Sequence, residues 1–205
     1  MRLILALVIG FLTPIWGYSQ YEQYLQKDEE PTSMRRAGAA FSVLESGTGI
    51  GGFYEIPLPH FYHIGLTTTF YFLRDSKQID YYDTYYGIPI SYNKKNNVYL
   101  IDLLFSVKKR LFAYEMDDSF QPYLSVSAGP VYGMNYPEED IIVKKPNEFG
   151  WAFAGMGAAG LNAVIDNVYI FGIRLQYRYM KFDKKIGERQ DHSTFDLRLE
   201  LGKQF

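Results

Sequence analysis

The C-terminal stretch FDLRLELGKQF (195–205) decides the kind of fold, because apolar and polar residues alternate in it up to the last position. The apolar parity carries Phe195, Leu197, Leu199, Leu201 and Phe205, and the polar parity carries Asp196, Arg198, Glu200 and Gln204. Period two is the period of a β-strand, whose successive side chains point to opposite faces. Chain ends usually fray, so an end that alternates up to Phe205 predicts a paired strand. We predict that it closes a β-barrel by pairing with the first strand.

The composition excludes several classes of protein. Hydrophobic residues make up 47% of the 205 residues and charged residues 21%, which argues against disorder. The 19 Tyr and 15 Phe are many for a soluble core, because each buried Tyr hydroxyl needs a partner. A net charge of -2 provides no basic surface for nucleic acid. The absence of Cys excludes disulfides, thiolate metal sites and a lipoprotein anchor.

The N-terminal segment has the pattern of an export signal. Arg2 precedes the apolar stretch LILALVIGFL (3–12), which is too short to span a membrane as a helix. Gly17 and Ser19 are small residues at the positions that a signal peptidase requires. We predict a cleaved signal peptide over residues 1–19 and a short periplasmic lead over 20–34; the alternative is an uncleaved anchor helix.

Two later uncharged stretches are long enough to be candidates for spanning helices. Residues 119–137 contain Pro122 and Pro130, and a proline inside a helix costs about 3 kcal/mol. Residues 149–165 are rich in Gly, which suits a helix that packs on a partner, but a lone helix has none. We therefore expect strands in both stretches.

Segments with a period of two recur along the rest of the chain. They occupy residues 36–45, 50–58, 62–74, 98–109, 122–134, 151–164, 168–181 and 192–205. Longer polar connections are expected at 75–97, 135–150 and 182–191, and short turns at 46–49, 57–60 and 165–167. Several segments reach the roughly 9–11 residues that a tilted strand needs to cross a bilayer. We predict that residues 35–205 form an all-β, eight-stranded antiparallel up-and-down transmembrane barrel.

The distribution of charge favours this barrel over a soluble β-sandwich, which also alternates. Strands over 98–109, 168–181 and 192–205 carry large apolar residues on one parity and charges on the other. A charge that faces lipid costs about 2–4 kcal/mol, so these charges should point inward. The inward charges are Asp102, Arg174, Arg178, Asp196, Arg198 and Glu200. We predict that they form a lumenal ion network; the alternative is a solvated strand face.

Two stretches, PYLSVSAGPVYGMN (122–135) and FDLRLELGKQF (195–205), resemble the small outer-membrane β-barrels of the OmpA and OmpX type, in the form common in Bacteroidota. The resemblance covers about residues 35–205. The ending is similar to the signal that the barrel assembly machinery recognises, with Phe205 last and Leu199 and Leu201 before it at alternating positions. Lys203 departs from the apolar residue that is usual there. The resemblance implies that the barrel assembly machinery is a partner during biogenesis.

Few residues are candidates for chemistry. His60, His63 and His192 are the 3 histidines, and no further ligands near them indicate a metal site. His192 and Ser193 with Glu200 resemble the residues of outer-membrane lipid A deacylases, but adjacent strand residues point to opposite faces. We therefore predict no enzyme, no cofactor and no metal.

Two groups of residues in the predicted outer loops are candidates for binding. Tyr81, Tyr82, Tyr85 and Tyr86 offer a large contact area at low entropic cost; the alternative is an aromatic girdle or a self-packed loop. A second group consists of Lys94, Lys95, Lys144, Lys145, Lys184 and Lys185. These lysines either contact lipopolysaccharide phosphates or are simply solvated.

These observations predict an integral outer-membrane protein of a Gram-negative bacterium. We expect a monomer surrounded by outer-membrane lipid and lipopolysaccharide, with a structural or surface-binding role. Eight strands leave room for side chains only, so we do not expect a general porin. The alternatives are a component of an outer-membrane secretion or assembly system and, third, a lipid A-modifying enzyme.

Overall fold

The structure is a computed structural model, and it describes residues 34–74, 79–92, 96–116, 119–137 and 146–205. The predicted signal peptide, residues 1–19, lies outside the described residues, as does the predicted lead apart from Met34. Among the described residues, no helix is both long and apolar enough to cross a membrane.

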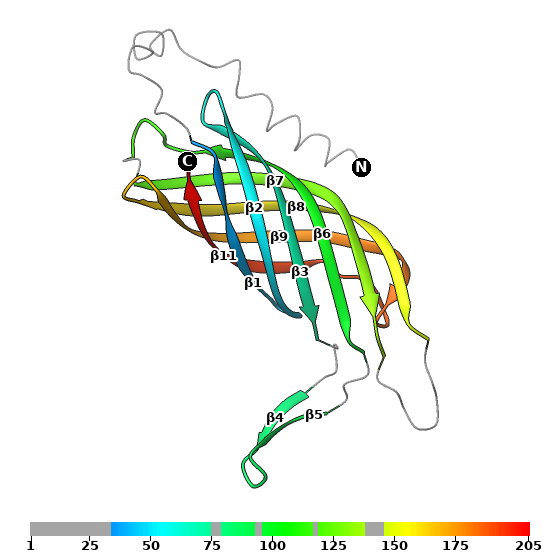
Figure 1. The fold of residues 1–205 in the computed structure, drawn as a ribbon. Helices are drawn as coiled ribbons and strands as arrows, with labels where there is room; N and C mark the ends of the chain where they lie inside the picture. The colour runs from blue at the N-terminus through cyan, green and yellow to red at the C-terminus, as the bar shows by residue number, and fades with distance from the viewer. Residues whose placement is uncertain (1–33, 75–78, 93–95, 117–118, 138–145) are drawn as a thin grey trace. The chain divides into compact units, whose positions relative to one another are not determined.

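Eight strands form one closed antiparallel barrel (Figure 1). They are β1 (Arg36–Leu44), β2 (Gly47–Leu58), β3 (Tyr62–Leu73), β6 (Val98–Arg110), β7 (Phe120–Asn135), β8 (Glu148–Ile165), β9 (Tyr169–Ile186) and β11 (Thr194–Gln204). Each strand pairs with its neighbours along the chain, and β11 pairs with β1. The predicted fold class is confirmed, and each of the eight predicted segments lies on one of these strands.

The barrel closes through the end of the chain. The register runs from Arg36 opposite Gln204 to Leu44 opposite Asp196. Beyond the strand, the backbone N–H of Phe205 donates to the carbonyl of Arg35 at 2.9 Å, and Arg35 returns the bond at 3.1 Å. The alternating C-terminal stretch is therefore paired up to its last residue.

β1 begins and β11 finishes at the same end of the barrel, which we call the terminal end. We call the opposite end the loop end. At the terminal end, β8 and β9 are joined by a tight turn in which Asp166 and Asn167 have φ of 53° and 54°. Asn and Asp tolerate this left-handed conformation better than most residues. Asp166 and Asn167 lie in the short turn predicted over 165–167.

Several expected connections differ from the structure, among them the loop expected over 135–150, because β8 begins at Glu148. The stretch 75–97, expected to be loop, contains a separate hairpin of β4 (Ile79–Asp83) and β5 (Ile88–Tyr92). The turn expected over 46–49 is shorter, because β2 begins at Gly47. The charged loop expected over 182–191 is wrong in part: β9 continues to Ile186, and β10 (Arg189–Asp191) pairs back onto it. At 46–49 and 182–191, pairing with a neighbouring strand extends β2 and β9 into residues that the sequence alone leaves as turn or loop.

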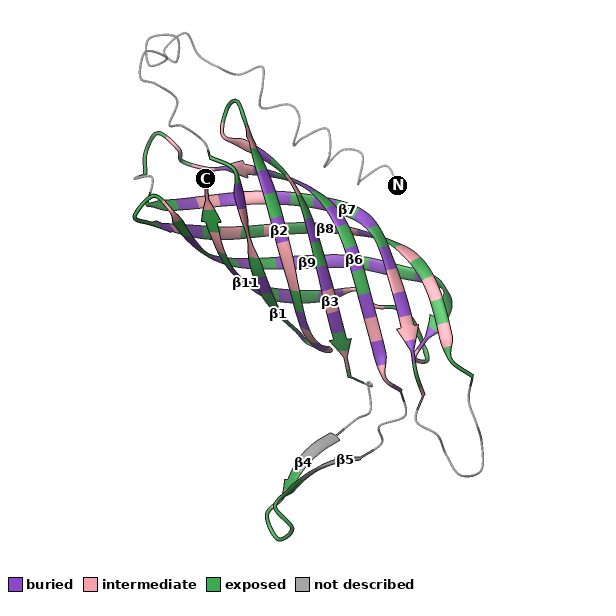
Figure 2. Cartoon of the chain, in the orientation of Figure 1, coloured by how far each residue is buried: buried purple, intermediate pink, exposed green. Residues whose placement is uncertain are grey.

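Burial alternates along every strand of the barrel (Figure 2). In β9, for example, residues of even number from Ile170 to Phe182 are buried, and those of odd number are exposed. The inward residues fill the barrel, and the outward residues form its apolar outer surface. The contacts of the interior and the chemistry of the outer surface both follow from this separation of inward and outward residues.

Candidate functional site: the barrel interior and its rim

Glu200 is the centre of a buried ion cluster in the half of the interior nearer the terminal end. Its Oε1 lies 2.8 Å from Nη2 of Arg174 and 3.1 Å from Nε of Arg198. Arg198 also donates from Nη1 to the hydroxyl of Thr69 at 2.8 Å. Arg174 and Arg198 lie directly opposite each other in the β9–β11 register, so the shared carboxylate attracts both guanidinium groups and offsets part of their repulsion.

A second cluster surrounds Arg178, farther toward the loop end. Arg178 donates from Nη2 to Asp196 at 3.0 Å and to the hydroxyl of Tyr71, and its guanidinium lies 4.0 Å from the Tyr71 ring centroid. Asp196 also accepts the amide of Gln176 at 2.6 Å. Asp102 is more distant, with its Oδ2 3.9 Å from Arg178. This cluster therefore joins strands on opposite sides of the barrel.

These two clusters contain all six residues of the predicted ion network. Each of the six side chains is at most 2% exposed. The structure contains the cross-strand ion pairs of Arg174 with Glu200 and of Arg178 with Asp196.

A third group of charges near the terminal end was not identified in the sequence. Lys108 forms an ion pair with Glu55, and its ammonium lies 4.2 Å from the ring centroid of Tyr123. Arg36 donates from Nη2 to Gln121 at 2.5 Å. Strand parity was the available signal, because Lys108 shares the inward parity of Asp102.

Glycines on the inner face make room for the large side chains. A Cβ on Gly160 would lie 2.5 Å from the Tyr123 hydroxyl, and a Cβ on Gly49 would lie 2.5 Å from the Tyr71 ring. Such distances do not occur, so any side chain at these positions would displace a ring. The narrow interior of an eight-stranded barrel thus alternates small and large residues across its width.

The half of the interior nearer the loop end is filled by apolar side chains. The buried cluster consists of Leu44, Tyr71, Val98, Leu100, Leu104, Val131, Ala154, Met156, Met180, Phe182 and Ile186. Phe182 is 2% exposed, and a Cβ on Gly133 would lie 2.9 Å from its ring. The charged loop predicted over 182–191 contains Phe182 and Ile186, although both keep the parity of Arg174 and Arg178. The described part of this half of the interior is therefore packed with apolar side chains.

A hydrogen-bonded rim lies over this apolar cluster. The amide of Asn135 donates to Asn96 at 3.0 Å and to Oε2 of Glu148 at 3.0 Å. The same Glu148 oxygen accepts the backbone N–H of Gly187 at 2.8 Å. These bonds tie β6, β7 and β8 to the turn after β9, within stretches that the sequence reading assigned to loops.

The residues that resemble a deacylase site make several other contacts in the structure. The Ser193 hydroxyl accepts the backbone N–H of Met180 at 3.1 Å. The hydroxyl and the backbone N–H of Ser193 both bond to Asp191, and these bonds lower the pKa of that carboxyl. Nε2 of His192 lies 3.1 Å from the carbonyl of Ile186, and Glu200 is in the ion cluster described above. Ser193 therefore takes part in the turn before β11 through these bonds.

No metal site is present among the residues that the structure describes. Of the predicted candidates, His63 is buried in the barrel interior, and His60 is exposed in a turn.

The outer surface of the barrel is apolar on all eight strands. Exposed examples, one from each strand in turn, are Phe41, Ile50, Ile64, Leu103, Val126, Leu161, Leu175 and Leu199. Aromatic rings gather toward the loop end, where Phe70, Phe72 and Tyr99 contact one another with centroids 4.8–5.9 Å apart. The predicted assembly-signal residues Leu199, Leu201 and Phe205 also face outward. Nζ of Lys203 lies 5.8 Å from the Tyr169 ring centroid, so this departure from the apolar pattern has an aromatic neighbour.

The predicted binding loop is the β4–β5 hairpin. Tyr82, Tyr85 and Tyr86 are 63%, 84% and 71% exposed, and Oδ1 of Asp83 accepts the backbone N–H groups of Tyr85 and Tyr86. The side chain of Tyr81 lies outside the described set. Lys184 and Lys185 are exposed at the end of β9, whereas Lys94, Lys95, Lys144 and Lys145 lie outside the described residues.

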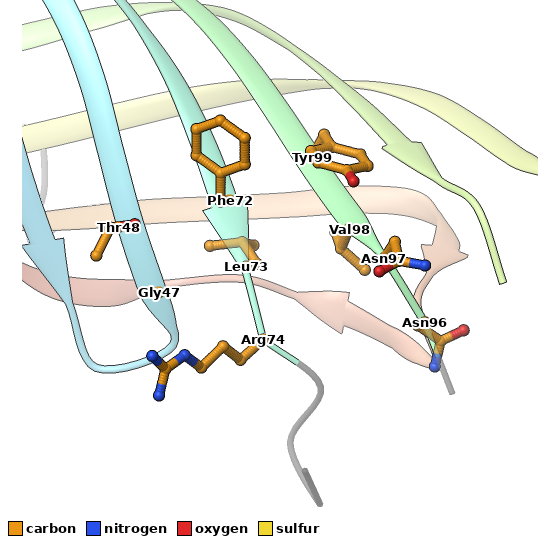
Figure 3. Close-up of a pocket in the computed structure, with 9 residues that line it drawn as sticks. All are labelled: Gly47, Thr48, Phe72, Leu73, Arg74, Asn96, Asn97, Val98 and Tyr99. Atoms are coloured by element: carbon orange, nitrogen blue, oxygen red, sulfur yellow. The ribbon is translucent and has the colours of Figure 1, made fainter. Parts of the chain in front are cut away.

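A small pocket opens at the loop end between the β2–β3 pair and β6 (Figure 3). Its volume is about 220 Å³. The polar and aromatic side chains that line it are those of Thr48, Phe72, Arg74, Asn96, Asn97 and Tyr99. It was not anticipated from the sequence, because its residues come from three strands.

The chain is similar in fold to solved outer-membrane barrels. Neisserial surface protein A, from Neisseria, is 11% identical with a TM-score of 0.54, over 83% of this chain and 94% of that one. The outer membrane protein OprG from Pseudomonas aeruginosa is 12% identical with a TM-score of 0.51, over 84% and 94% respectively. No family model and no curated protein sequence matches the chain. These similarities establish the fold: an eight-stranded barrel of the outer-membrane kind.

Proposed function

We propose that this chain is an integral outer-membrane protein with a structural or surface-binding role and a closed interior. The observation that carries the proposal is that charged residues are buried inside the barrel and apolar residues are exposed outside it. Buried positions hold six ion-network residues, each at most 2% exposed, while large apolar side chains are exposed on every barrel strand. A water-soluble protein has the opposite arrangement.

Hydrocarbon is the cover that fits this surface. Leaving one Leu, Ile or Phe side chain in water forgoes about 1.5–3 kcal/mol, and soluble monomers rarely expose apolar patches beyond a few hundred Å². A protein partner would cover one side of the barrel, but the apolar residues lie on all eight strands. A bilayer covers all sides at once. OprG, which shares the fold, is an outer membrane protein, and this supports the outer membrane of a Gram-negative bacterium as the location.

The same proposal includes several predictions that follow from the sequence. The chain is exported with a cleaved signal peptide, belongs to the form common in Bacteroidota, and is inserted by the barrel assembly machinery through Phe205 and the residues before it. It functions as a monomer in contact with outer-membrane lipid and lipopolysaccharide. The packed apolar cluster around Phe182 supports a closed lumen rather than a general pore.

Cell fractionation tests the location. The full chain, expressed in a Gram-negative host, should sediment with the outer membrane, need detergent for extraction and change its gel mobility on heating. Protease added to intact cells should cut near Tyr81 to Tyr86. Recovery of the mature chain from the periplasm without detergent would refute the proposal, and a large stable conductance in planar bilayers would refute the closed lumen.

A further inference from the structure

The pocket at the loop end joins two kinds of surface. Phe72 and Tyr99 line it and belong to the outward aromatic cluster, and Phe72 is 44% exposed. Arg74, Asn97 and Thr48 line it as well and provide a cation, an amide and a hydroxyl. Figure 3 shows the rings of Phe72 and Tyr99 on adjacent strands, with the Arg74 side chain extending toward the β1–β2 turn and Asn97 on the other side. The pocket thus adjoins the apolar outer surface at Phe72 and Tyr99.

The lining selects for an anion. Among the residues that the structure describes, it contains one guanidinium, two amides and two hydroxyls, those of Thr48 and Tyr99, and no carboxylate. The Arg74 side chain is exposed, and its backbone N–H donates to the carbonyl of Ser46 at 2.6 Å, which holds this residue beside the β1–β2 turn. Asn97 is anchored by its own amide, which donates to the Tyr136 carbonyl at 3.0 Å. Guanidinium groups bind phosphate through paired charge-assisted hydrogen bonds.

We propose that this pocket binds the phosphorylated head group of a membrane lipid, with Arg74 on the phosphate and the lipid chains along Phe72 and Tyr99. The inference rests on the proposed membrane location. A volume of about 220 Å³ is below the roughly 300–1,000 Å³ of pockets that enclose a whole small molecule. The ligand must therefore extend out of the pocket, and the adjoining surface is apolar and aromatic. A free phosphate would leave that surface unused.

Lipid binding to the folded barrel tests the proposal. The full mature chain is folded in neutral detergent, folding is checked by heat-dependent gel mobility, and bound molecules are counted by native mass spectrometry. The probes are dihexanoyl phosphatidic acid, dihexanoylglycerol and inorganic phosphate. Arg74→Gln is compared with Arg189→Gln, because Arg189 is exposed at the same end of the barrel and does not line the pocket.

We expect the wild-type barrel to bind one phosphatidic acid, about tenfold more tightly than dihexanoylglycerol or inorganic phosphate. Arg74→Gln should raise the Kd for phosphatidic acid about tenfold, and Arg189→Gln should leave it within about twofold. Tyr99→Ala should weaken the binding of phosphatidic acid and leave the affinity for inorganic phosphate unchanged.

Two results would overturn the lipid site. Equal binding of phosphatidic acid by the two arginine variants would show that Arg74 does not bind the lipid head group. Equal affinity for phosphatidic acid and inorganic phosphate would indicate a site for a small anion. Either result leaves a barrel that still folds only in detergent, so the proposed function survives it. A chain that folds and stays dissolved without detergent would instead refute the proposed function.

Discussion

The two halves of the barrel interior fill similar space with opposite chemistry. Toward the terminal end, Glu200 holds Arg174 and Arg198, and Lys108 pairs with Glu55. Toward the loop end, Phe182, Ile186 and their neighbours pack without charges. Charged partners must meet at fixed distances, whereas apolar side chains of similar volume can replace one another. The terminal half therefore depends on particular partners and the loop half on volume.

Glu200→Gln is expected to have the largest effect, because it tests the half that depends on partners. The substitution keeps the shape and removes the negative charge that Arg174 and Arg198 share, while both arginines stay buried. Breaking a buried pair in this way costs about 3–5 kcal/mol. The measurement is the free energy of unfolding in urea, for the barrel in micelles, followed by gel mobility.

Glu45→Gln is the matched control, since Glu45 is exposed after β1. It should change the free energy of unfolding by less than about 0.5 kcal/mol. If the two glutamine variants were equally stable, the interior charges would be hydrated rather than held by one another.

Phe182→Ala tests the half that depends on volume. Removing the ring leaves a cavity among Gly133, Leu100 and Ile186, and we expect a loss of about 3 kcal/mol. Phe182→Leu keeps most of the volume and should cost less than about 1.5 kcal/mol. Urea titrations of the two variants under identical conditions give the comparison. A Leu variant as unstable as the Ala variant would show that this half also requires one particular side chain.

Strand parity was enough to predict the fold and half of this contrast. Alternation placed Asp102, Arg174 and Glu200 on the inner face, because a charge has few other places in a strand that faces lipid. The same rule, carried four residues beyond Phe182, would have assigned Ile186 to the interior. The charged residues around Phe182 concealed it: Asp183, Lys184 and Lys185 read as a loop.

Other features depend on contacts that sequence spacing does not encode. Tyr71 contacts Arg178 and Asn135 contacts Asn96, across 107 and 39 residues. Which inward residues face each other across a barrel depends on its tilt and shear, and these follow from the full set of strand registers. The head-group pocket is of the same kind, because Thr48, Arg74 and Asn97 lie side by side only after β2, β3 and β6 are aligned.

Tyr71→Phe has the smallest expected effect and tests the boundary between the halves. Tyr71 belongs to the apolar cluster through its ring and to the Arg178 cluster through its hydroxyl. Losing the hydroxyl leaves a guanidinium donor without that partner, while Asp196 still accepts from Arg178 at 3.0 Å. We expect a loss of about 1–2 kcal/mol, compared with less than about 0.5 kcal/mol for Tyr179→Phe, whose side chain is 56% exposed on the outer face. Equal urea midpoints for these two variants would mean that the Tyr71 hydroxyl adds no stability and that only its ring does. The polar half would then end at Asp196.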